Sequence, residues 1–188
     1  MYINAGELDT RLEVLQLTEK APKQWEWAAV RRPWGKVTLE TSSRKNLFSS
    51  IGIGARDATI VLRRQELTMH HALRAGGQHL FVTAIVPQGR GHLKVSAALV
   101  SVETVTLRPD GARAGAAFPG VLTEKYLRHG QEWPMSVNDL EMALVVPKAV
   151  TLRPGRLVEA RGAAWEVLVP YELDEYKNEY VIGRRAEL

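Results

Sequence analysis

Basic side chains between residues 44 and 64 form the set in this chain best suited to bind an anion. The set consists of Arg44, Lys45, Arg56, Arg63 and Arg64. Only Glu40 and Asp57 lie nearby with the opposite charge. Guanidinium and ammonium groups neutralise phosphate, and no helix that could read base edges accompanies them. The pattern indicates either a solvated basic face or sequence-independent contact with a nucleic-acid backbone.

The histidines do not predict a metal site. His70 and His71 are adjacent, so in extended chain they point to opposite sides, and no further ligand stands beside them at a metal-binding spacing. His79 and His92 are expected to approach each other across a hairpin. Solvated or hydrogen-bonded histidines are the interpretation that these spacings favour.

Two other motifs lack the residues that their chemistry needs. The sequence of residues 51–54, Ile-Gly-Ile-Gly, has neither the third glycine nor the Lys-Ser/Thr pair of a phosphate-binding loop. Acidic residues between Glu172 and Glu179 do not alternate as in a calcium loop and are interpreted as a solvated turn. No Ser, His and Asp set is recognisable. We therefore expect no enzyme, no metal and no cofactor.

Composition limits the class of protein. The chain has 188 residues, a net charge of +4 and no cysteine, which excludes disulfides, cysteine-ligated zinc and thiol catalysis. Residues 1–110 carry 15 basic and 10 acidic side chains, so the basic excess lies in the first half. No apolar run is long enough for a membrane helix and no signal peptide is recognisable, so we expect a soluble protein made in the cytoplasm, with no membrane partner.

Alternation of apolar and polar residues predicts short strands throughout. In the first half they cover residues 7–17, 25–30, 35–40, 59–62, 79–86 and 92–100, with a tight turn at Gly76-Gly77. The hairpin of residues 79–100 is expected to have a wetter face. Residues 66–100 recur in altered form as residues 150–183, which predicts an internal repeat of roughly eighty residues.

The expected fold is mostly β, with two small barrel or sandwich units in tandem. The first unit covers residues 1–108 and includes a long projecting loop at residues 41–57. A Gly- and Pro-rich linker at residues 109–120 leads to a second, smaller unit at residues 121–188.

Aromatic residues in the first unit are candidates for an interface. They are Trp25, Trp27, Trp34 and Phe48. Large aromatic side chains fill either the core and rim of a small barrel or a patch that anchors a partner. Both interpretations stay open for the tryptophans.

Several segments of residues 5–107, taken in their order along the chain, resemble the head-closure, or head–tail joining, family of tailed bacteriophages. They are Gly6–Leu15, the pair Trp25 and Trp27, Trp34–Glu40, Ser42–Phe48, Arg56–Arg63 and Leu80–Ile85. The resemblance covers a little over half of the chain. Family members end near the position of Leu107, so the second unit departs from the family pattern.

The resemblance implies a structural protein of the virion neck. Such a protein is a small β-barrel that assembles as a homo-oligomeric ring, here expected to have six or twelve copies, between the portal-bound adaptor and a tail-terminator or other tail protein. A loop from each copy projects toward the channel and helps to retain the packaged double-stranded DNA, independently of sequence. In this chain the loop would be residues 41–57, with Arg44, Lys45 and Arg56 facing the channel or neighbouring copies.

Two alternatives remain. A tail terminator or another ring subunit of the neck or tail would also be rich in β-structure. A nucleic-acid-binding tandem of OB-like barrels would line a groove with aromatic and basic side chains. The distance in sequence between Trp25, Trp27 and Trp34 and the basic cluster argues against the OB-like alternative.

Overall fold

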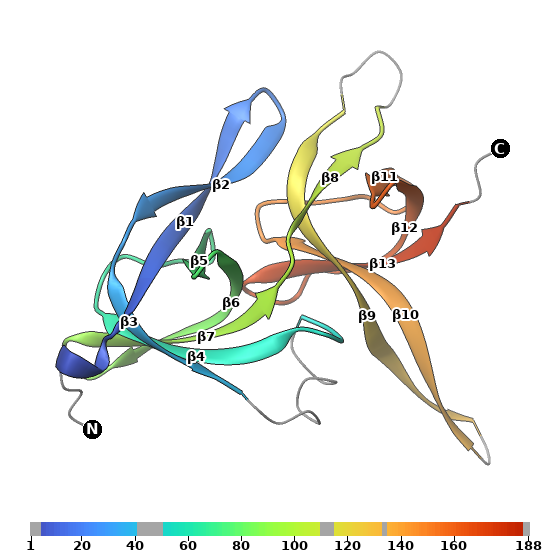
Figure 1. The fold of residues 1–188 in the computed structure, drawn as a ribbon. Helices are drawn as coiled ribbons and strands as arrows, with labels where there is room; N and C mark the ends of the chain where they lie inside the picture. Colours follow the sequence, from blue (N-terminus) through green and yellow to red (C-terminus); the bar gives the residue numbers. More distant parts are fainter. Residues whose placement is uncertain (1–4, 41–50, 110–114, 133–134, 186–188) are drawn as a thin grey trace.

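A computed structural model describes residues 5–40, 51–109, 115–132 and 135–185, and within residues 126–140 it describes the backbone alone. The described chain contains a short 3-10 helix at Ala5–Glu7, no α-helix, and thirteen strands, which confirms the mostly β prediction (Figure 1). The strands are β1 (Thr10–Ala21), β2 (Gln24–Arg31), β3 (Trp34–Leu39), β4 (Arg56–Arg63), β5 (His71–Ala75), β6 (Gln78–Gln88), β7 (His92–Val100), β8 (Glu103–Leu107), β9 (Ala117–Glu132), β10 (Met135–Pro147), β11 (Leu157–Ala160), β12 (Ala163–Tyr171) and β13 (Lys177–Arg184). No helix among the described residues is long and apolar enough to cross a membrane.

The first unit is a closed sheet of six strands. Its pairing runs β1-β3-β4-β7-β6-β5 and returns from β5 to β1, as in a small barrel. The residues that point inward are apolar and alternate with polar ones, as Leu93 and Val95 do with the exposed Lys94. The core formed by these side chains includes Leu12, Ile60, Leu62, Leu73 and Leu80.

The second unit closes in the same way. Its pairing runs β8-β9-β10-β13-β12-β11 and returns from β11 to β8. Its core includes Val105, Phe118, Leu144, Val158 and Tyr180. The ends of β9 and β10 continue beyond the closed sheet as a long hairpin that projects from the molecule (Figure 1).

The two units repeat the same order of strand pairing, with β2 as an additional strand in the first. The turn at Gly76-Gly77 between β5 and β6 corresponds to the turn at Arg161-Gly162 between β11 and β12, and all four residues have positive φ. The register also shifts at equivalent places, after Val82 in β6 and after Val167 in β12. The two units thus share one strand order, and equivalent residues in this part of the chain are 85 positions apart.

The boundary between the units differs from the prediction. Strand β8 was expected in the first unit but pairs with β9 and β11 of the second. Residues 117–120, predicted as part of a linker, belong to β9. Phe118 is buried in the second core. Val105 and Leu144 approach Gly120 so closely that a Cβ at this position would not fit without a shift of these side chains. Small residues that suggest a linker are here required for packing.

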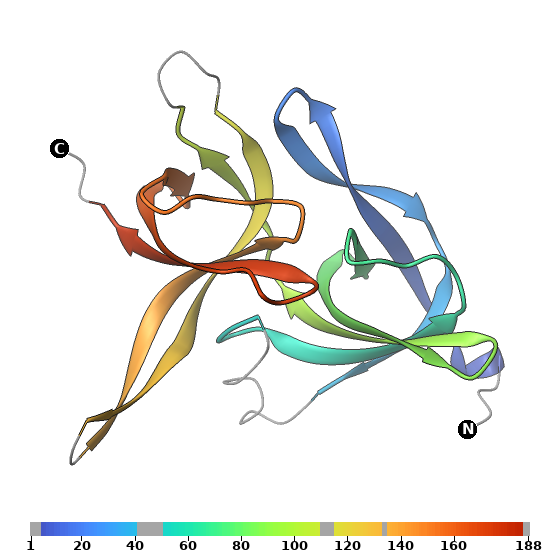
Figure 2. The ribbon, with the colours of Figure 1, turned by 180° about the vertical axis from the view of Figure 1, so that it is seen from behind.

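The units pack against each other through a buried apolar cluster. Phe81 and Ala98 from the outer face of β6 and β7 meet Val121 and Val145 from β9 and β10. The expectation of a wetter face on the 79–100 hairpin is therefore wrong at Phe81, because the second unit covers it. The turn between β12 and β13 also reaches the first unit, where the Tyr176 hydroxyl accepts a hydrogen bond of 3.0 Å from the Ile85 amide (Figure 2).

Only part of the predicted loop at residues 41–57 lies among the described residues, and that part is packed rather than projecting. Ile51 and Ala55 are buried in the cluster between the units. The Ile53 amide donates to the Glu124 carbonyl (2.9 Å), and the Thr123 hydroxyl donates to the Ile53 carbonyl (3.1 Å). The glycine pattern of residues 51–54 thus serves packing, since a Cβ at residue 52 would overlap Thr123.

Candidate interaction surfaces

The predicted basic residues do not form one cluster. Arg56 begins β4 and Arg63 ends it, so the seven-residue step separates their Cα atoms by roughly 23 Å along the strand. Arg64 follows Arg63. Arg44 and Lys45 lie outside the described residues. A single site containing the whole predicted set is not supported by the positions of the described members.

A different group of cations surrounds the end of β4. Arg63 lies opposite His92 on β7, and the Arg64 amide donates to the Gly91 carbonyl (2.8 Å), which brings the turn after β6 and its Arg90 beside them. We call Arg63, Arg64, Arg90 and His92 the basic end of the first unit. Arg90 was not predicted, and His92 was considered only as a neighbour of His79, because distance in sequence hides a contact that strand register creates. The predicted turn between the strands ending at 86 and beginning at 92 was the available signal.

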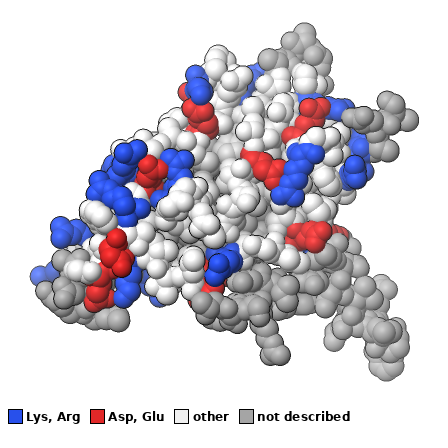
Figure 3. Space-filling model, viewed as in Figure 1, with Lys and Arg blue, Asp and Glu red and all other residues white. Residues whose placement is uncertain are grey.

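The face shown in Figure 3 has mixed charge. Space-filling representation shows Lys and Arg beside Asp and Glu, separated by wide uncharged areas (Figure 3). Several exposed cations pair with carboxylates, among them Lys36 with Glu7 at 2.8 Å and Lys20 with Glu26 at 3.1 Å. Paired charges of this kind produce little net field. The face shown in Figure 3 therefore lacks the continuous basic groove expected of a dedicated nucleic-acid-binding domain.

The three tryptophans predicted as interface candidates have different environments. Trp27 on β2 is half-buried, packs against the core of the second unit, and has its ring centroid 5.6 Å from that of His79. Trp25 is 36% exposed on the same face of β2. Trp27 therefore joins the units, which is the core-and-rim alternative for this residue, whereas Trp25 remains a candidate for contact with a partner. Phe48 lies outside the described residues.

Trp34 is the most exposed of the described tryptophans, at 51%. The Arg11 guanidinium lies 5.2 Å from its ring centroid, a cation–π arrangement. Trp34, Leu8, Pro33 and Arg63 line an open cavity of about 440 Å³. An aromatic ring and a member of the basic end thus share one cavity, although they are far apart in sequence.

His71 and His79 have structural roles in the first unit, and the predicted pair His79 and His92 does not form. His79 and His92 lie at opposite ends of the β6–β7 pairing, so the expected approach across the hairpin is wrong. Burial lowers the pKa of His79 to about 4, and its Nε2 is buried with no hydrogen-bond partner among the described residues. His71 is buried beside Thr68, whose amide donates to its Nδ1 (3.1 Å), and burial lowers its pKa. Among the described residues no cluster of His, Asp and Glu could hold a metal ion.

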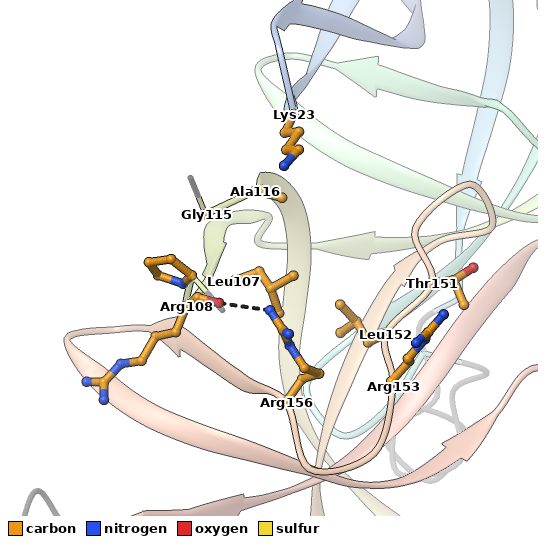
Figure 4. Close-up of a pocket in the computed structure, with 10 residues that line it drawn as sticks. Lys23, Leu107, Arg108, Gly115, Ala116, Thr151, Leu152, Arg153 and Arg156 are labelled. Atoms are coloured by element: carbon orange, nitrogen blue, oxygen red, sulfur yellow. Dashed lines mark hydrogen bonds between the residues drawn. The ribbon is translucent and has the colours of Figure 1, made fainter. Parts of the chain in front are cut away.

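A second cationic surface lines a cavity of about 470 Å³ between the units (Figure 4). Its charged lining residues are Lys23, Arg108, Arg153 and Arg156. Arg156 donates to the Arg108 carbonyl (3.0 Å), whereas the Arg108 guanidinium points away from the cavity and pairs with Glu159 at 2.7 Å. The cavity has the charge to admit an anionic group. Sequence reasoning missed it because its lining comes from three separate segments.

The acidic residues near the β12–β13 turn are not a simple solvated turn. Glu179 is buried and pairs with Lys125 at 2.6 Å and with Lys177. Burial lowers the pKa of Lys125, and the neighbouring Lys177 lowers it further. Tyr180 donates to Glu172 (2.6 Å), and its burial raises the pKa of its hydroxyl. These contacts fix the part of the second unit that touches the first.

No family model, no curated protein and no solved structure matches this chain.

Proposed function

We propose that this protein is a structural subunit of a tailed-bacteriophage neck, which forms a ring between the portal-bound adaptor and the tail and helps to retain packaged DNA. The observation that carries the proposal is the coincidence of the family resemblance with one folding unit. The described segments that bear the resemblance fall on η1 and on strands β1, β2, β3, β4 and β6. Apart from β2, these strands belong to the closed sheet of the first unit.

The surface of the first unit supports assembly. Strand β2 pairs with β1 along one edge, and among the described residues its other edge meets a strand only where Gln24 lies beside Ala117 of β9. Such an edge leaves backbone groups available to another chain. Trp25 and Val30 on β2 are both exposed apolar residues. Self-association into a ring would cover features of this kind.

The basic end supplies the charge for contact with DNA. Arg63, Arg64, Arg90 and His92 converge on the end of one sheet, and the part of the chain that the structure describes has no α-helix that could enter a groove and read bases. Contact of this type is independent of sequence and depends on salt. In the proposed ring the basic end faces the channel, and no catalysis is involved.

The mass of the particle in solution tests the proposal. Purified protein is analysed by native mass spectrometry alone and after mixing with purified portal–adaptor complex. A closed multimer, alone or on that complex, is the expected result. A chain that remains monomeric and never joins the complex would remove the basis for the proposed function.

One observation favours a second candidate function, the binding of single-stranded nucleic acid. Trp34 and Arg63 line the same cavity, so the separation of aromatic and basic residues in sequence no longer argues against it. Bases stack on exposed aromatic rings while cations contact the backbone. Fluorescence anisotropy with a labelled oligothymidylate distinguishes the two functions. Salt-dependent binding by the monomer, weakened by Trp34→Ala, supports this candidate, whereas binding only after ring formation supports the neck protein.

A further inference from the structure

One part of the contact between the two units consists of two cross-strand residue pairs. Phe81 on β6 lies opposite Ala98 on β7, and this pair supplies the face of the first unit together with Ile51 and Ala55. Val121 on β9 lies opposite Val145 on β10, and this pair supplies the face of the second. The four residues of these pairs are at most 6% exposed. This part of the contact is therefore apolar.

The internal repeat places a second version of each face on the molecule. The β12–β13 pair equivalent to Phe81 and Ala98 is Glu166 and Gly183, and each lies 85 residues further along the chain. On β3 and β4 the pair equivalent to Val121 and Val145 is Lys36 and Val61. We call Glu166, Leu168 and Gly183 the β12 face, and Lys36 and Val61 the β3 face.

The charged side chain of each face is accessible to solvent, while Val61 and Gly183 are half-buried. The side chain of Lys36 is 47% exposed and that of Glu166 is 36% exposed. Leu168, at the register shift of β12 beside Gly183, is 48% exposed, and Val169 and Tyr171 on the same strand are also exposed. Exposed apolar residues so close together on one strand are typical of an interaction surface.

The two open faces lie on opposite sides of the molecule. Strand β13 runs away from the first unit, so its C-terminal end lies on the far side of the second unit (Figure 1). Strand β4 begins beside the second unit and runs away from it, so its C-terminal end lies toward the far side of the first unit (Figure 1). A surface on each outer side permits copies of the chain to join head to tail.

We propose that the β12 face of one copy binds the β3 face of the next, in the arrangement that the two units already have within the chain. In this contact Glu166 faces Lys36 of the neighbouring copy and Leu168 packs on Val61. Within one copy Glu166 lies 3.5 Å from Arg185 and Lys36 lies 2.8 Å from Glu7. These exposed pairs contribute little to stability, so exchanging them for a pair between copies costs little.

The proposal rests on the ring of the proposed function and adds the surfaces that would build it. A contact between two different faces is heterologous, so it continues from copy to copy until the rotation closes a ring. Every chain then contributes two units, and the junctions within and between chains alternate around the assembly. Two β12 faces brought together would place one Glu166 carboxylate against the other, and like charges repel. Symmetrical pairing of two β12 faces is therefore disfavoured.

Cysteine cross-linking tests the contact directly, because the chain has no cysteine of its own. Lys36→Cys and Glu166→Cys are introduced into separate chains, which are mixed and treated with a short bismaleimide. A covalent dimer is expected only in the mixture. The matched control replaces Lys36→Cys with Lys20→Cys, because Lys20 has a 68% exposed side chain on the β1–β2 hairpin, away from the β3 face.

Charge reversal provides a second measurement. Glu166→Lys should raise the concentration required for half-assembly by about tenfold, and Lys36→Glu in the same chain should restore most of the loss. If rings form without the 36–166 product and both reversals have no effect, the contact is wrong while the proposed function stands. If the 36–166 product forms but neither a ring nor a complex with the portal–adaptor is found, the contact stands and the proposed function fails.

Discussion

Phe81 is the residue whose removal should separate the two units. It is 4% exposed and belongs to the buried cluster that also contains Ala98, Val121 and Val145. Truncating a buried phenylalanine to alanine typically costs about 3–5 kcal/mol, because it removes transfer free energy and leaves a cavity. The lost contacts cross between the units. Phe81→Ala should therefore reduce the cooperativity of unfolding as well as the total free energy of unfolding.

Urea unfolding and hydrogen exchange measure these two effects separately. The native protein should unfold with one transition observed by tryptophan fluorescence, whereas Phe81→Ala should be less stable by about 3 kcal/mol and show a broadened or divided transition. Amide exchange should accelerate in β6 and β7 of the first unit and also in β9 and β10 of the second. Loss of protection on both sides is the signature of a contact between units.

Leu80→Ala is the matched control. Leu80 is adjacent in sequence and fully buried, but it points into the core of the first unit. This variant should lose a similar free energy while leaving exchange in β9 and β10 close to that of the native protein. The reasoning is refuted if Phe81→Ala costs less than about 1 kcal/mol, or if its exchange pattern is the same as that of Leu80→Ala.

Three further changes have expected results that urea unfolding can measure. Gly52→Ala should lower the free energy of unfolding by about 2–3 kcal/mol, because residue 52 has a φ of 138° and a Cβ there would overlap a neighbouring side chain. Gly54→Ala is the control: its φ is also positive but the space around it is open, so it should cost less, and equal losses would contradict this account. Glu179→Gln should cost about 3 kcal/mol because it leaves the buried Lys177 beside the partly buried Lys125, whereas Glu166→Gln in an exposed pair should cost under about 0.5 kcal/mol. A small loss for Glu179→Gln would show that its cluster is not buried in solution. Burial depresses the pKa of His79 to about 4, so as pH falls below about 6.5 the unfolded chain binds a proton that the folded chain does not. The free energy of unfolding should therefore decline by roughly 2–3 kcal/mol between pH 6.5 and 4, and His79→Gln should remove that part of the decline. An unchanged pH profile in the variant would contradict this assignment.

The sequence predicts the strands well where one face of the sheet is buried. Alternation identifies β1, β3 and β7, and the double glycine identifies the turn between β5 and β6. Strand β5 was missed because its five residues, His71–Ala75, are too short for alternation to stand out. Its pairing with β1 closes the first sheet, so the closure depends on a contact between residues about sixty positions apart.

The contact between the units leaves a weaker signal in the sequence than the strands do. Leu80, Phe81 and Val82 are consecutive buried residues, which indicates a strand covered on both faces. Alternation alone assigns Phe81 to the open side, and nothing in its own segment identifies Val121 and Val145 as the residues that cover it. The partner of an outer face is a property of two distant segments, and one sequence does not reveal it.

The grouping of the basic residues was also limited by contacts between segments that are distant in sequence. Arg63 and Arg64 were recognised as candidates, but they were grouped with Arg56 because the three are close in sequence. An eight-residue strand separates residues at its two ends more effectively than a loop does, so proximity in sequence was misleading. Strand register instead places Arg63 opposite His92. A prediction that first paired the strands and then compared charges would have found the basic end.

The repeat shows how two copies of one sheet can take different roles. Inward-facing equivalents stay apolar in both units, as with Val82 and Val167, since each closed sheet needs its own core. Outward-facing equivalents differ: Phe81 is covered within the chain, whereas its counterpart Glu166 is open. An apolar face left open would favour aggregation of free chains, while a charged face with a limited apolar area can bind reversibly. The apolar contact within the chain is therefore covered in the folded protein, and the proposed joint between copies would form only where concentration or a partner favours it.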